Sequence, residues 1–416
     1  MSSRISRRTV VKGLSGAILG AGGPITRSAR PHAFVFTARG GGGFLGGGEK
    51  PGRMNSDGTG FHLFDFHRAN EVGFGIYGFF ADGHHALMLS IEKNEDWKTK
   101  SFYEYYPKSR THIWKCDLRT GRLTELATKE RIAPFYAPCG IVPGEKRILV
   151  SINQNGSESL YSMNLDGTGA VRLTKPGEYV YGVSISHDGK RVAFHADYRI
   201  YTMGIDGTNR TEVAGRNGWI YFGTSWAPDD SMVLFQVCNP AETPGHDWSD
   251  IWIGRPDGSE IKALTTGASA WFDASYGTKT NPGRGSIMPK WAPDGSGILY
   301  SRRIPGSVLP WQDAVGRKDT DHFNRDFRPD LATGGTQICS VNPRTGVSAP
   351  ITHCNPPSWE FRPDWSPDSK KILFCRAAVG ENPVIWVVDR DGSNERKLTD
   401  GNGNGGEFPR WLPARD

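Results

Sequence analysis

The sequence lacks a long hydrophobic run, a cysteine motif and a serine-hydrolase motif. No stretch approaches the roughly 20 consecutive apolar residues that a membrane-spanning helix requires, so we expect no membrane span. The 6 cysteines are scattered without a Cys-x-x-Cys pair or a His/Cys cluster at zinc spacing, so buried free thiols are the simplest expectation. No Gly-x-Ser-x-Gly elbow is present, which argues against a catalytic peptidase of the α/β-hydrolase kind.

Glycine, proline and aromatic residues are abundant instead. The 416 residues include 53 glycines, 27 prolines, 13 Trp, 13 Tyr and 20 Phe, a composition that favours many short strands joined by tight turns. A net charge of +6 suits an anionic ligand such as a uronic-acid glycan. Because the chain has no dense basic run, nucleic acid is the weaker alternative, and we expect none as a partner.

The N-terminal segment predicts export. Residues 1–23 combine a basic region, a weakly apolar run and small residues where cleavage could occur. Residues 6–12, SRRTVVK, resemble the bacterial twin-arginine motif, in which two arginines precede a hydrophobic run. The resemblance implies export in the folded state to the periplasm or beyond; the alternative is a basic disordered tail. We assign residues 1–30 to an export signal and linker, and 31–416 to the folded domain.

Two near-identical heptapeptides, MNSDGTG at 54–60 and MNLDGTG at 163–169, indicate a repeated unit. Related turn sequences occur at 116–121, 203–207, 253–258, 341–346 and 388–392. Each of the seven lies between two short alternating runs of apolar residues. This pattern predicts a strand, a tight turn that needs positive φ at glycine, and a second strand.

A second turn motif alternates with the first. It reads WAPDD at 226–230, WAPDG at 291–295 and WSPDS at 365–369, with looser copies at 80–83, 142–145 and 185–189 and a last copy at 411–414. Each repeat therefore has four strands, a period that neither a β-sandwich nor a β-helix explains. We predict an all-β fold, a seven-bladed β-propeller with four-stranded blades. The C-terminal segment 407–413 and the N-terminal segment 31–38 supply the first two strands of one blade, so the two ends of the chain close the ring.

Both motifs resemble the TolB-like propeller repeat, in which Trp-Ser-Pro-Asp-Gly turns alternate with Asp-Gly turns. The resemblance covers roughly residues 31–416 and implies the propeller fold. It does not imply a single function, because such propellers serve as scaffolds, peptidase lids and lyases.

The two faces of the predicted propeller differ. The Pro-Asp and Asp-Gly turns lie together on one face, called here the turn face, and they are short throughout. The connections on the opposite face, called the loop face, are long and mix aromatic residues with Lys and Arg; they span 92–111, 239–250, 266–287 and 302–336. Long loops above a rigid scaffold are typical of binding sites, although these loops could also simply pack on one another. His84 and His85 follow a Pro-Asp-type turn, and we expect them on the surface of the turn face.

Two histidines and two tyrosines on the loop face are the candidate catalytic residues. His195 ends a second strand, where it could act as a general base with a pKa near neutral. His246 lies in a Pro/Gly-bounded loop, where it could belong to an acid/base or a metal-ligand cluster. Tyr181 and Tyr221 lie near the starts of inner strands, where a phenol could orient a sugar or donate a proton. The structural alternatives are a core histidine and aromatic packing between blades.

Three cations converge on the axis of the predicted propeller. Lys290, Arg362 and Arg410 lie in inner-strand segments, where they repel one another unless they meet an anion or the carboxylates of Glu360 and Asp364. This convergence is the strongest sequence argument for an anionic ligand. The other candidate substrate-binding residues of the loop face are Arg302, Trp248, Trp271, Tyr136 and His112.

Two functions suit such a loop face. The chain is similar to propeller-fold lyases that act on oligogalacturonate, ulvan or rhamnose–glucuronate linkages. This resemblance implies β-elimination of an acidic polysaccharide by a monomer, with a divalent cation, Ca²⁺ or Mn²⁺, as a candidate cofactor. The His-x-His cluster that holds the metal in oligogalacturonate lyases has no counterpart, since the corresponding segment 358–365 reads SWEFRPDW. The alternative is a non-catalytic periplasmic TolB-like protein that uses the same face to bind a protein or glycan partner.

Overall fold

A computed structural model describes most of the chain. The described residues are 31–38, 49–97, 108–127, 140–154, 157–178, 180–239, 241–242, 247–272, 288–313, 325–353, 355–401 and 405–414. Their regular structure is almost entirely β, and the one complete helical element among them is the 3-10 helix η2 (Pro329–Leu331). None of these described residues lies in a helix that is long and apolar enough to cross a membrane.

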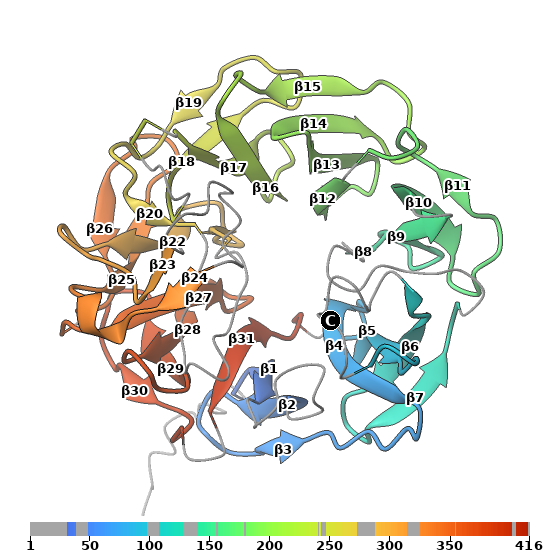
Figure 1. Ribbon diagram of the computed structural model, residues 1–416, viewed down its shortest axis with the longest axis horizontal. Coiled ribbons are helices and arrows are strands. Elements are labelled where there is room, and N and C mark those ends of the chain that lie inside the picture. Colours follow the sequence, from blue (N-terminus) through green and yellow to red (C-terminus); the bar gives the residue numbers. More distant parts are fainter. Residues whose placement is uncertain are drawn as a thin grey trace, which may run out of the picture. The chain divides into compact units, whose positions relative to one another are not determined.

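Residues His32–Asp416 form one compact unit, a β-propeller whose antiparallel sheets follow one another around a common axis (Figure 1). Five of the sheets are separate four-stranded blades. Named from the axis outward, their strands are β4 (Glu71–Phe79), β5 (His85–Glu92), β6 (Thr111–Asp117) and β7 (Arg122–Glu125); β8 (Gly140–Ile141), β9 (Arg147–Gln154), β10 (Ser157–Asn164) and β11 (Val171–Arg172); β12 (Val180–Ile185), β13 (Arg191–Ala196), β14 (Arg199–Gly204) and β15 (Thr211–Ala214); β27 (Trp359–Trp365), β28 (Lys371–Ala377), β29 (Val384–Asp389) and β30 (Arg396–Lys397); and β31 (Gly406–Trp411), β1 (Ala33–Ala38), β2 (Lys50–Asn55) and β3 (His62–Leu63).

A nine-stranded sheet occupies the part of the ring where two further separate blades were expected. Its main path runs β16-β17-β18-β20-β22-β25-β26, while β19 pairs with β18 and β21 pairs with β22. The short strand β20 causes the fusion, because it pairs with β18 on one side and with β22 on the other. The number of seven blades therefore stays a prediction. The bounds are β16 (Ile220–Trp226), β17 (Val233–Cys238), β18 (Trp248–Gly254), β19 (Lys262–Ala263), β20 (Ala270–Trp271), β21 (Lys290–Trp291), β22 (Ile298–Arg303), β25 (Thr336–Val341) and β26 (Ser348–Pro350), with β23 (Trp311–Asp313) and β24 (Arg325–Phe327) paired separately.

The two ends of the chain close the ring, as the sequence predicts. Strand β31 pairs antiparallel with β1, which places Trp411 opposite Phe34 and Glu407 opposite Thr37. Phe34, Phe36 and Trp411 also belong to one buried apolar cluster. Closure therefore rests on strand hydrogen bonds and on aromatic packing together.

The Asp-Gly turns have the predicted conformation. In the two near-identical heptapeptides the same hydrogen bond forms, from Asn55 Nδ2 to Thr59 Oγ1 and from Asn164 Nδ2 to Thr168 Oγ1, both at 3.0 Å. The side chains of the heptapeptide are therefore used within the turn, so the repeat is a unit of architecture. The turn glycines have φ between 73° and 88°, a region that only glycine adopts at little cost; they are Gly58, Gly121, Gly167, Gly207, Gly258, Gly346 and Gly392.

The second strand of a blade is deeply buried, because neighbouring blades cover both of its faces. All six residues of β17 are buried, and so are the last five residues of β13. Cys116 and Cys339 are buried free thiols, as expected, and burial raises the pKa of each to about 12. A polar side chain on a second strand is shielded from water, so only another protein group can serve as its hydrogen-bond partner. His195 lies on such a strand.

Candidate functional site

The loop-face end of the β12–β15 blade brings two predicted catalytic residues together. Tyr181 of the inner strand β12 lies opposite His195 of β13 in the strand register. Their ring centroids are 4.2 Å apart with the ring planes at 72°, an edge-to-face contact. Phe222 and Tyr198 complete an aromatic cage, with centroids 5.2 and 5.8 Å from that of His195. Tyr181 keeps part of its surface exposed, so it is the member of the pair that a ligand can reach.

His195 itself is sealed inside this cage. Its side chain has no exposed surface, and neither ring nitrogen has a hydrogen-bond partner among the described residues. Burial lowers the pKa of His195 to about 3, because an imidazolium here would lose its hydration without gaining a partner. The expected pKa near neutral is therefore wrong, and the ring is neutral at physiological pH. A catalytic role for His195 stays a prediction, and it requires either a conformational change or action through Tyr181.

Tyr221 lies in a different environment from Tyr181. It is 6% exposed and packs against Trp219 and Phe235 inside the apolar cluster between two blades. Burial raises the pKa of its phenol, which opposes loss of the proton at neutral pH. The residue of β16 that contacts His195 is the neighbouring Phe222.

Near the axis, three inner strands each carry a charged side chain directly before a tryptophan. These residues are Lys290 of β21, Asp364 of β27 and Arg410 of β31. All three keep some exposed surface but are crowded by protein, so burial lowers the pKa of Lys290 and of Arg410 and raises that of Asp364. The charges also act on one another, because Asp364 favours the charged form of both cations whereas Arg410 disfavours that of Lys290.

Lys290 and Arg410 have no ion pair within the described part of the chain. One oxygen of the Asp364 carboxylate accepts a hydrogen bond from the backbone N–H of Trp411 at 2.9 Å. The Arg410 guanidinium lies 4.9 Å from the centre of the Phe79 ring. Two cationic side chains thus lie near a single carboxylate at the axis, so the formal charge of the three groups is positive.

The third predicted axial cation, Arg362, is paired. Its guanidinium donates to Glu407 Oε2 at 2.7 Å and stacks over the Phe408 ring at 3.4 Å. Glu360 is also paired, because its Oε1 accepts a hydrogen bond from Arg376 Nε at 2.8 Å. Arg362 therefore differs from Lys290 and Arg410, because Arg362 has an ion-pair partner.

Several inner strands contain a β-bulge at the level of Arg362. The strand register shifts in β12, β16 and β27 and where β31 meets β1. The residues with positive φ at these bulges are Gly182, Gly223, Arg362 and Phe408. Glycine tolerates this conformation, whereas for Arg362 and Phe408, at 53° and 52°, it costs roughly 1–2 kcal/mol each. Phe408 is also 40% exposed, so backbone strain and exposed apolar surface coincide beside Arg410.

The two predicted sugar-stacking tryptophans lie in the core. Trp248 and Trp271 are 7% and 1% exposed, and they share an apolar cluster with Trp359 and Phe361. The centroids of the Trp271 and Trp359 rings are 5.1 Å apart. Other aromatic rings therefore cover these two, and a role in stacking on a sugar would require this cluster to open.

Arg302 and His112 take part in polar contacts inside the sheets. Arg302 lies opposite Gln337 of β25, and with the Gln337 amide turned so that its oxygen faces Arg302, this oxygen accepts a hydrogen bond from Arg302 Nε at 3.2 Å. His112 is held between two carboxylates, with Nδ1 2.6 Å from Glu125 Oε1 and Nε2 2.8 Å from Glu92 Oε1. The last two candidates, His246 and Tyr136, lie outside the described residues, so their roles stay predictions.

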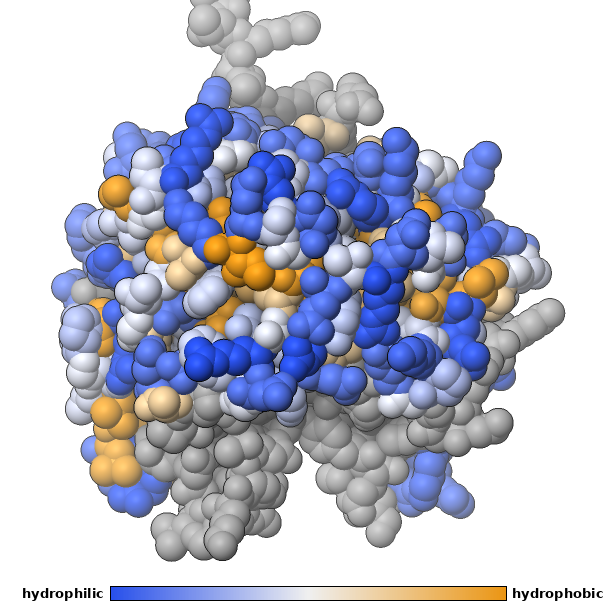
Figure 2. All heavy atoms as spheres, turned by 90° about the horizontal axis from the view of Figure 1, so that it is seen from above, coloured by the Kyte–Doolittle hydropathy of each residue, from blue (hydrophilic) through white to orange (hydrophobic). Residues whose placement is uncertain are grey.

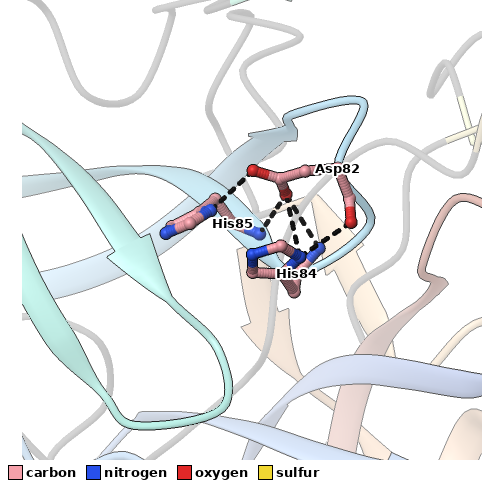
Figure 3. A group of neighbouring side chains, drawn as sticks. All are labelled: Asp82, His84 and His85. Atoms are coloured by element: carbon pink, nitrogen blue, oxygen red, sulfur yellow. Dashed lines mark hydrogen bonds and ion pairs between the residues drawn. The ribbon is translucent and has the colours of Figure 1, made fainter. Parts of the chain in front are cut away.

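The turn between β4 and β5 contains His84 and His85, for which the sequence predicts only a place on the surface of the turn face. Asp82, His84 and His85 each offer a ligand atom within 4.8 Å of the others, which makes them a candidate metal site (Figure 3). His85 Nδ1 lies 2.6 Å from Asp82 Oδ2, and His84 Nδ1 lies 2.8 Å from the Asp82 carbonyl oxygen. Although burial opposes the change, hydrogen bonds from His84 and His85 lower the pKa of Asp82 to about 2. The sequence signal was a His-His pair directly after the turn Asp-Gly.

Comparison with sequences shows only distant likeness. No family model matches the chain. Among curated proteins it is similar to dipeptidyl-peptidase 5 of Porphyromonas gingivalis, at 23% identity over 314 residues that cover 61% of this chain and 45% of that protein. The chain thus spans less than half the length of this relative.

Solved structures of similar fold include two oligogalacturonate lyases and a TolB protein. The lyase from Vibrio parahaemolyticus matches with a TM-score of 0.51 and 15% identity, covering 91% of this chain and 90% of the lyase. An oligogalacturonate lyase in complex with manganese matches with a TM-score of 0.50 and 15% identity, covering 89% and 85%. TolB from Acinetobacter baumannii matches with a TM-score of 0.47 and 14% identity, covering 92% and 67%. At these identities the likeness shows the fold alone, a β-propeller.

Proposed function

We propose that the protein binds uronic-acid-containing oligo- or polysaccharides at the axis and the loop face, and cleaves them by β-elimination. The charge at the axis is the observation that carries this proposal. Lys290 and Arg410 have no ion pair among the described residues and share the single carboxylate of Asp364. A ligand carboxylate would balance this charge, and β-elimination needs the uronate carboxylate to be neutralised.

Phe408 adds an apolar surface on the same strand as Arg410. Along the second half of β31, Phe408 and Arg410 keep exposed surface whereas Pro409 and Trp411 are buried. An exposed aromatic ring two residues from a cation suits a uronic acid, because the ring can stack on the sugar while the cation holds the carboxylate. Strand β31 therefore offers both halves of an acidic-sugar site.

The reaction also needs groups that move protons. A base removes the proton from C5 of the uronate, the C–H electrons form the C4–C5 double bond, and the departing O4 takes up a proton. Tyr181 is the exposed candidate for the proton donor, with neutral His195 behind it as a positioning residue. His246 stays the proposed base, and Tyr221 the second choice for the acid.

We propose that a divalent cation, Ca²⁺ or Mn²⁺, takes part only when it arrives bound to the glycan, and that the protein does not hold it. Among the described residues, the group of His, Cys, Asp or Glu side chains that could hold a metal is Asp82, His84 and His85, on the turn face. The described donors of the loop face thus do not fit a resident metal. Lys290 and Arg410 can supply the positive charge in its place.

Architecture and location complete the proposal. The nine-stranded sheet is interpreted as two blades, β16–β19 and β21-β22-β25-β26, bridged by β20, which gives seven blades. Residues 1–30 are interpreted as an export signal that delivers a monomer to the periplasm or the exterior, where polymeric glycans are met. Mass spectrometry of the exported protein would support the export signal if residues 1–30 are missing.

The test is an activity screen with a binding arm. The purified chain is incubated with polygalacturonate, alginate, ulvan and glucuronan, and the near-ultraviolet absorbance of the unsaturated product is followed. We expect one polymer to respond, and the rate to fall by about 100-fold in Tyr181→Phe or His246→Ala, the usual scale for a lost general acid or base. Tyr198→Phe is the matched control, because Tyr198 lines the same cage but is 53% exposed.

The outcomes separate the two functions. Saturable glycan binding without product would reject the lyase and leave the non-catalytic, TolB-like binding protein. Neither binding nor product with any polymer would reject the acidic-glycan proposal as a whole.

A further inference from the structure

We propose that Asp82, His84 and His85 form a binding site for one divalent transition-metal ion on the turn face. The site lies in the tight turn that connects β4 to β5 (Figure 3). It is separate from the loop face, so the proposal does not depend on the proposed lyase function.

The spacing of the donor atoms suits a small metal ion. His85 Nδ1 lies 2.6 Å from Asp82 Oδ2, and His84 Nδ1 lies 3.5 Å from Asp82 Oδ1. Metal–ligand bonds of about 2.0–2.1 Å in tetrahedral geometry place neighbouring ligand atoms about 3.3 Å apart. The ligand atoms of the three residues already lie within 4.8 Å of one another, so small side-chain rotations would bring all three donors onto one ion.

The turn holds the three residues in place. Gly83 N donates to Phe80 O at 3.2 Å, and Phe80 N donates to His85 O at 3.0 Å. Asp82 Oδ1 accepts the backbone N–H groups of His84 and His85 at 3.0 and 2.9 Å. This oxygen anchors the turn, which leaves Oδ2 as the metal ligand. Little conformational freedom is lost on binding, because the donors are already gathered.

The exposure of the site allows an ion to enter and to keep water ligands. The side chains of His84 and His85 are 24% and 23% exposed, and that of Asp82 is 32% exposed. Two imidazoles and one carboxylate favour Zn²⁺, Co²⁺, Ni²⁺ or Cu²⁺ over Ca²⁺, which prefers six to eight oxygen ligands. The ion would take the place of the direct contact between His85 Nδ1 and Asp82 Oδ2.

Two other histidines with carboxylate partners show what is particular to this turn. His187 Nδ1 lies 2.9 Å from Asp230 Oδ1, also at a Pro-Asp-type turn, but no second imidazole joins it in a described ligand group. His112 uses both of its ring nitrogens on separate glutamates, so its carboxylates do not converge on one point. The turn after β4 is the one described place where two imidazoles and a carboxylate meet.

The experiment is metal titration of the full chain, prepared without a histidine tag and stripped with a chelator. Calorimetry with ZnCl₂ and the visible absorption of added Co²⁺ report stoichiometry, affinity and ligand field. We expect one ion per chain at neutral pH. His84→Ala and His85→Ala should each weaken binding by at least about tenfold, and the double variant should abolish the tetrahedral Co²⁺ spectrum.

Two further variants guard against a misfolded turn. Asp82→Asn keeps an oxygen for the backbone N–H groups but removes the charged ligand, so it should weaken binding while the melting temperature stays near that of the parent. His187→Ala removes a comparable surface histidine and should leave the affinity for Zn²⁺ unchanged. An undiminished high-affinity site in the His84→Ala/His85→Ala double variant, or no binding of Zn²⁺ by the parent chain, would overturn the proposal.

Discussion

Two groups of non-glycine residues with positive φ, one at the turn face and one at the axis, use backbone strain differently. At the turn face, Glu145, Asp230 and Ser369 have φ of 56°, 57° and 57° in Pro-Asp-type turns. Each of their side chains accepts a backbone N–H from the corresponding turn of the preceding blade. The donors are Ala81 for Glu145, His187 and Asp188 for Asp230, and Asp294 for Ser369.

The strained residues at the axis have a different environment. Arg362 is held by Glu407, whereas Phe408 is 40% exposed and contacts the neighbouring blade through the Arg362 guanidinium stacked over its ring. On the same strand, Arg410 has no ion pair among the described residues. At the turn face a bond between blades offsets the strain, which indicates a structural role. At the axis the backbone strain is accompanied by the exposed Phe408 ring and by Arg410, which has no ion pair among the described residues. This combination is typical of a binding site.

The largest effect is expected at the axial cations. The double substitution Lys290→Met/Arg410→Met removes the two charges without an ion pair, and we expect affinity for the acidic glycan to fall by about 100-fold, since each charged contact contributes about tenfold or more. Titration calorimetry with the polymer found in the screen measures this loss. Thermal unfolding is followed in parallel, because the double substitution also leaves the buried carboxylate of Asp364 without its two cations.

The matched control is Lys190→Met/Lys370→Met, which removes the same charge from exposed residues of the turn face. It should leave glycan affinity within about twofold, because exposed charges act weakly and are screened by salt. Equal losses in the two double variants would show that net charge alone attracts the glycan, and the contrast between axis and turn face would fail.

The second effect concerns the pH dependence of stability. The pKa of His195 is 6.5 in the unfolded chain and about 3 in the folded chain, so the unfolded chain binds more protons between these values. Stability is therefore complete above about pH 6.5 and falls as the pH drops toward 3, by up to about 5 kcal/mol. Between pH 7 and about pH 5 the loss from this group is about 2 kcal/mol.

The variant His195→Leu has a side chain of similar size that does not titrate. Urea unfolding near pH 7 and about pH 5 should show the acid-dependent loss from this group in the parent and not in the variant. If the parent and the variant lose stability equally over this interval, His195 gains a proton or a partner in the folded state, and the sealed cage is incorrect.

A smaller effect is expected at the turn face. Asp230→Ala loses the hydrogen bonds from His187 and Asp188 and keeps the positive φ, so we expect a loss of about 2 kcal/mol in the free energy of unfolding. Asp230→Gly loses the same bonds but relieves the strain, so about 1 kcal/mol of that loss should be recovered. Thermal unfolding of both variants checks the order. An Ala variant as stable as the Gly variant would show that the backbone at residue 230 is not strained.

The sequence predicts the fold better than the site, because the fold depends on local turn chemistry. Positive φ at the repeated glycines and the pairing of β31 with β1 follow from motifs that can be read residue by residue. The burial of His195 and of Trp271 could not be predicted in this way, because it depends on which side chains of the next blade cover them. The pairing of Arg362 with Glu407 depends likewise on a contact between distant segments.

Phe408 was not predicted as a site residue, because its signal is a backbone conformation combined with exposure, and neither is visible in the sequence. If its strain serves ligand binding, relieving the strain should lower affinity while stability stays near that of the parent. Phe408→Gly removes the strain at φ 52°, so we expect unfolding free energy to stay within about 1 kcal/mol of the parent. Its affinity for the glycan should fall by about tenfold, the scale of one lost stacking contact.

Phe408→Ala is the informative partner of that variant, because it loses the ring but keeps the strained backbone. It should bind the glycan as weakly as Phe408→Gly and be less stable than it by about 1 kcal/mol. Calorimetry and thermal unfolding of the pair separate the two contributions. If both variants bind like the parent and both are less stable than it, the ring serves to support Arg362, and the axis then resembles the turn face in using a contact between blades for structure alone.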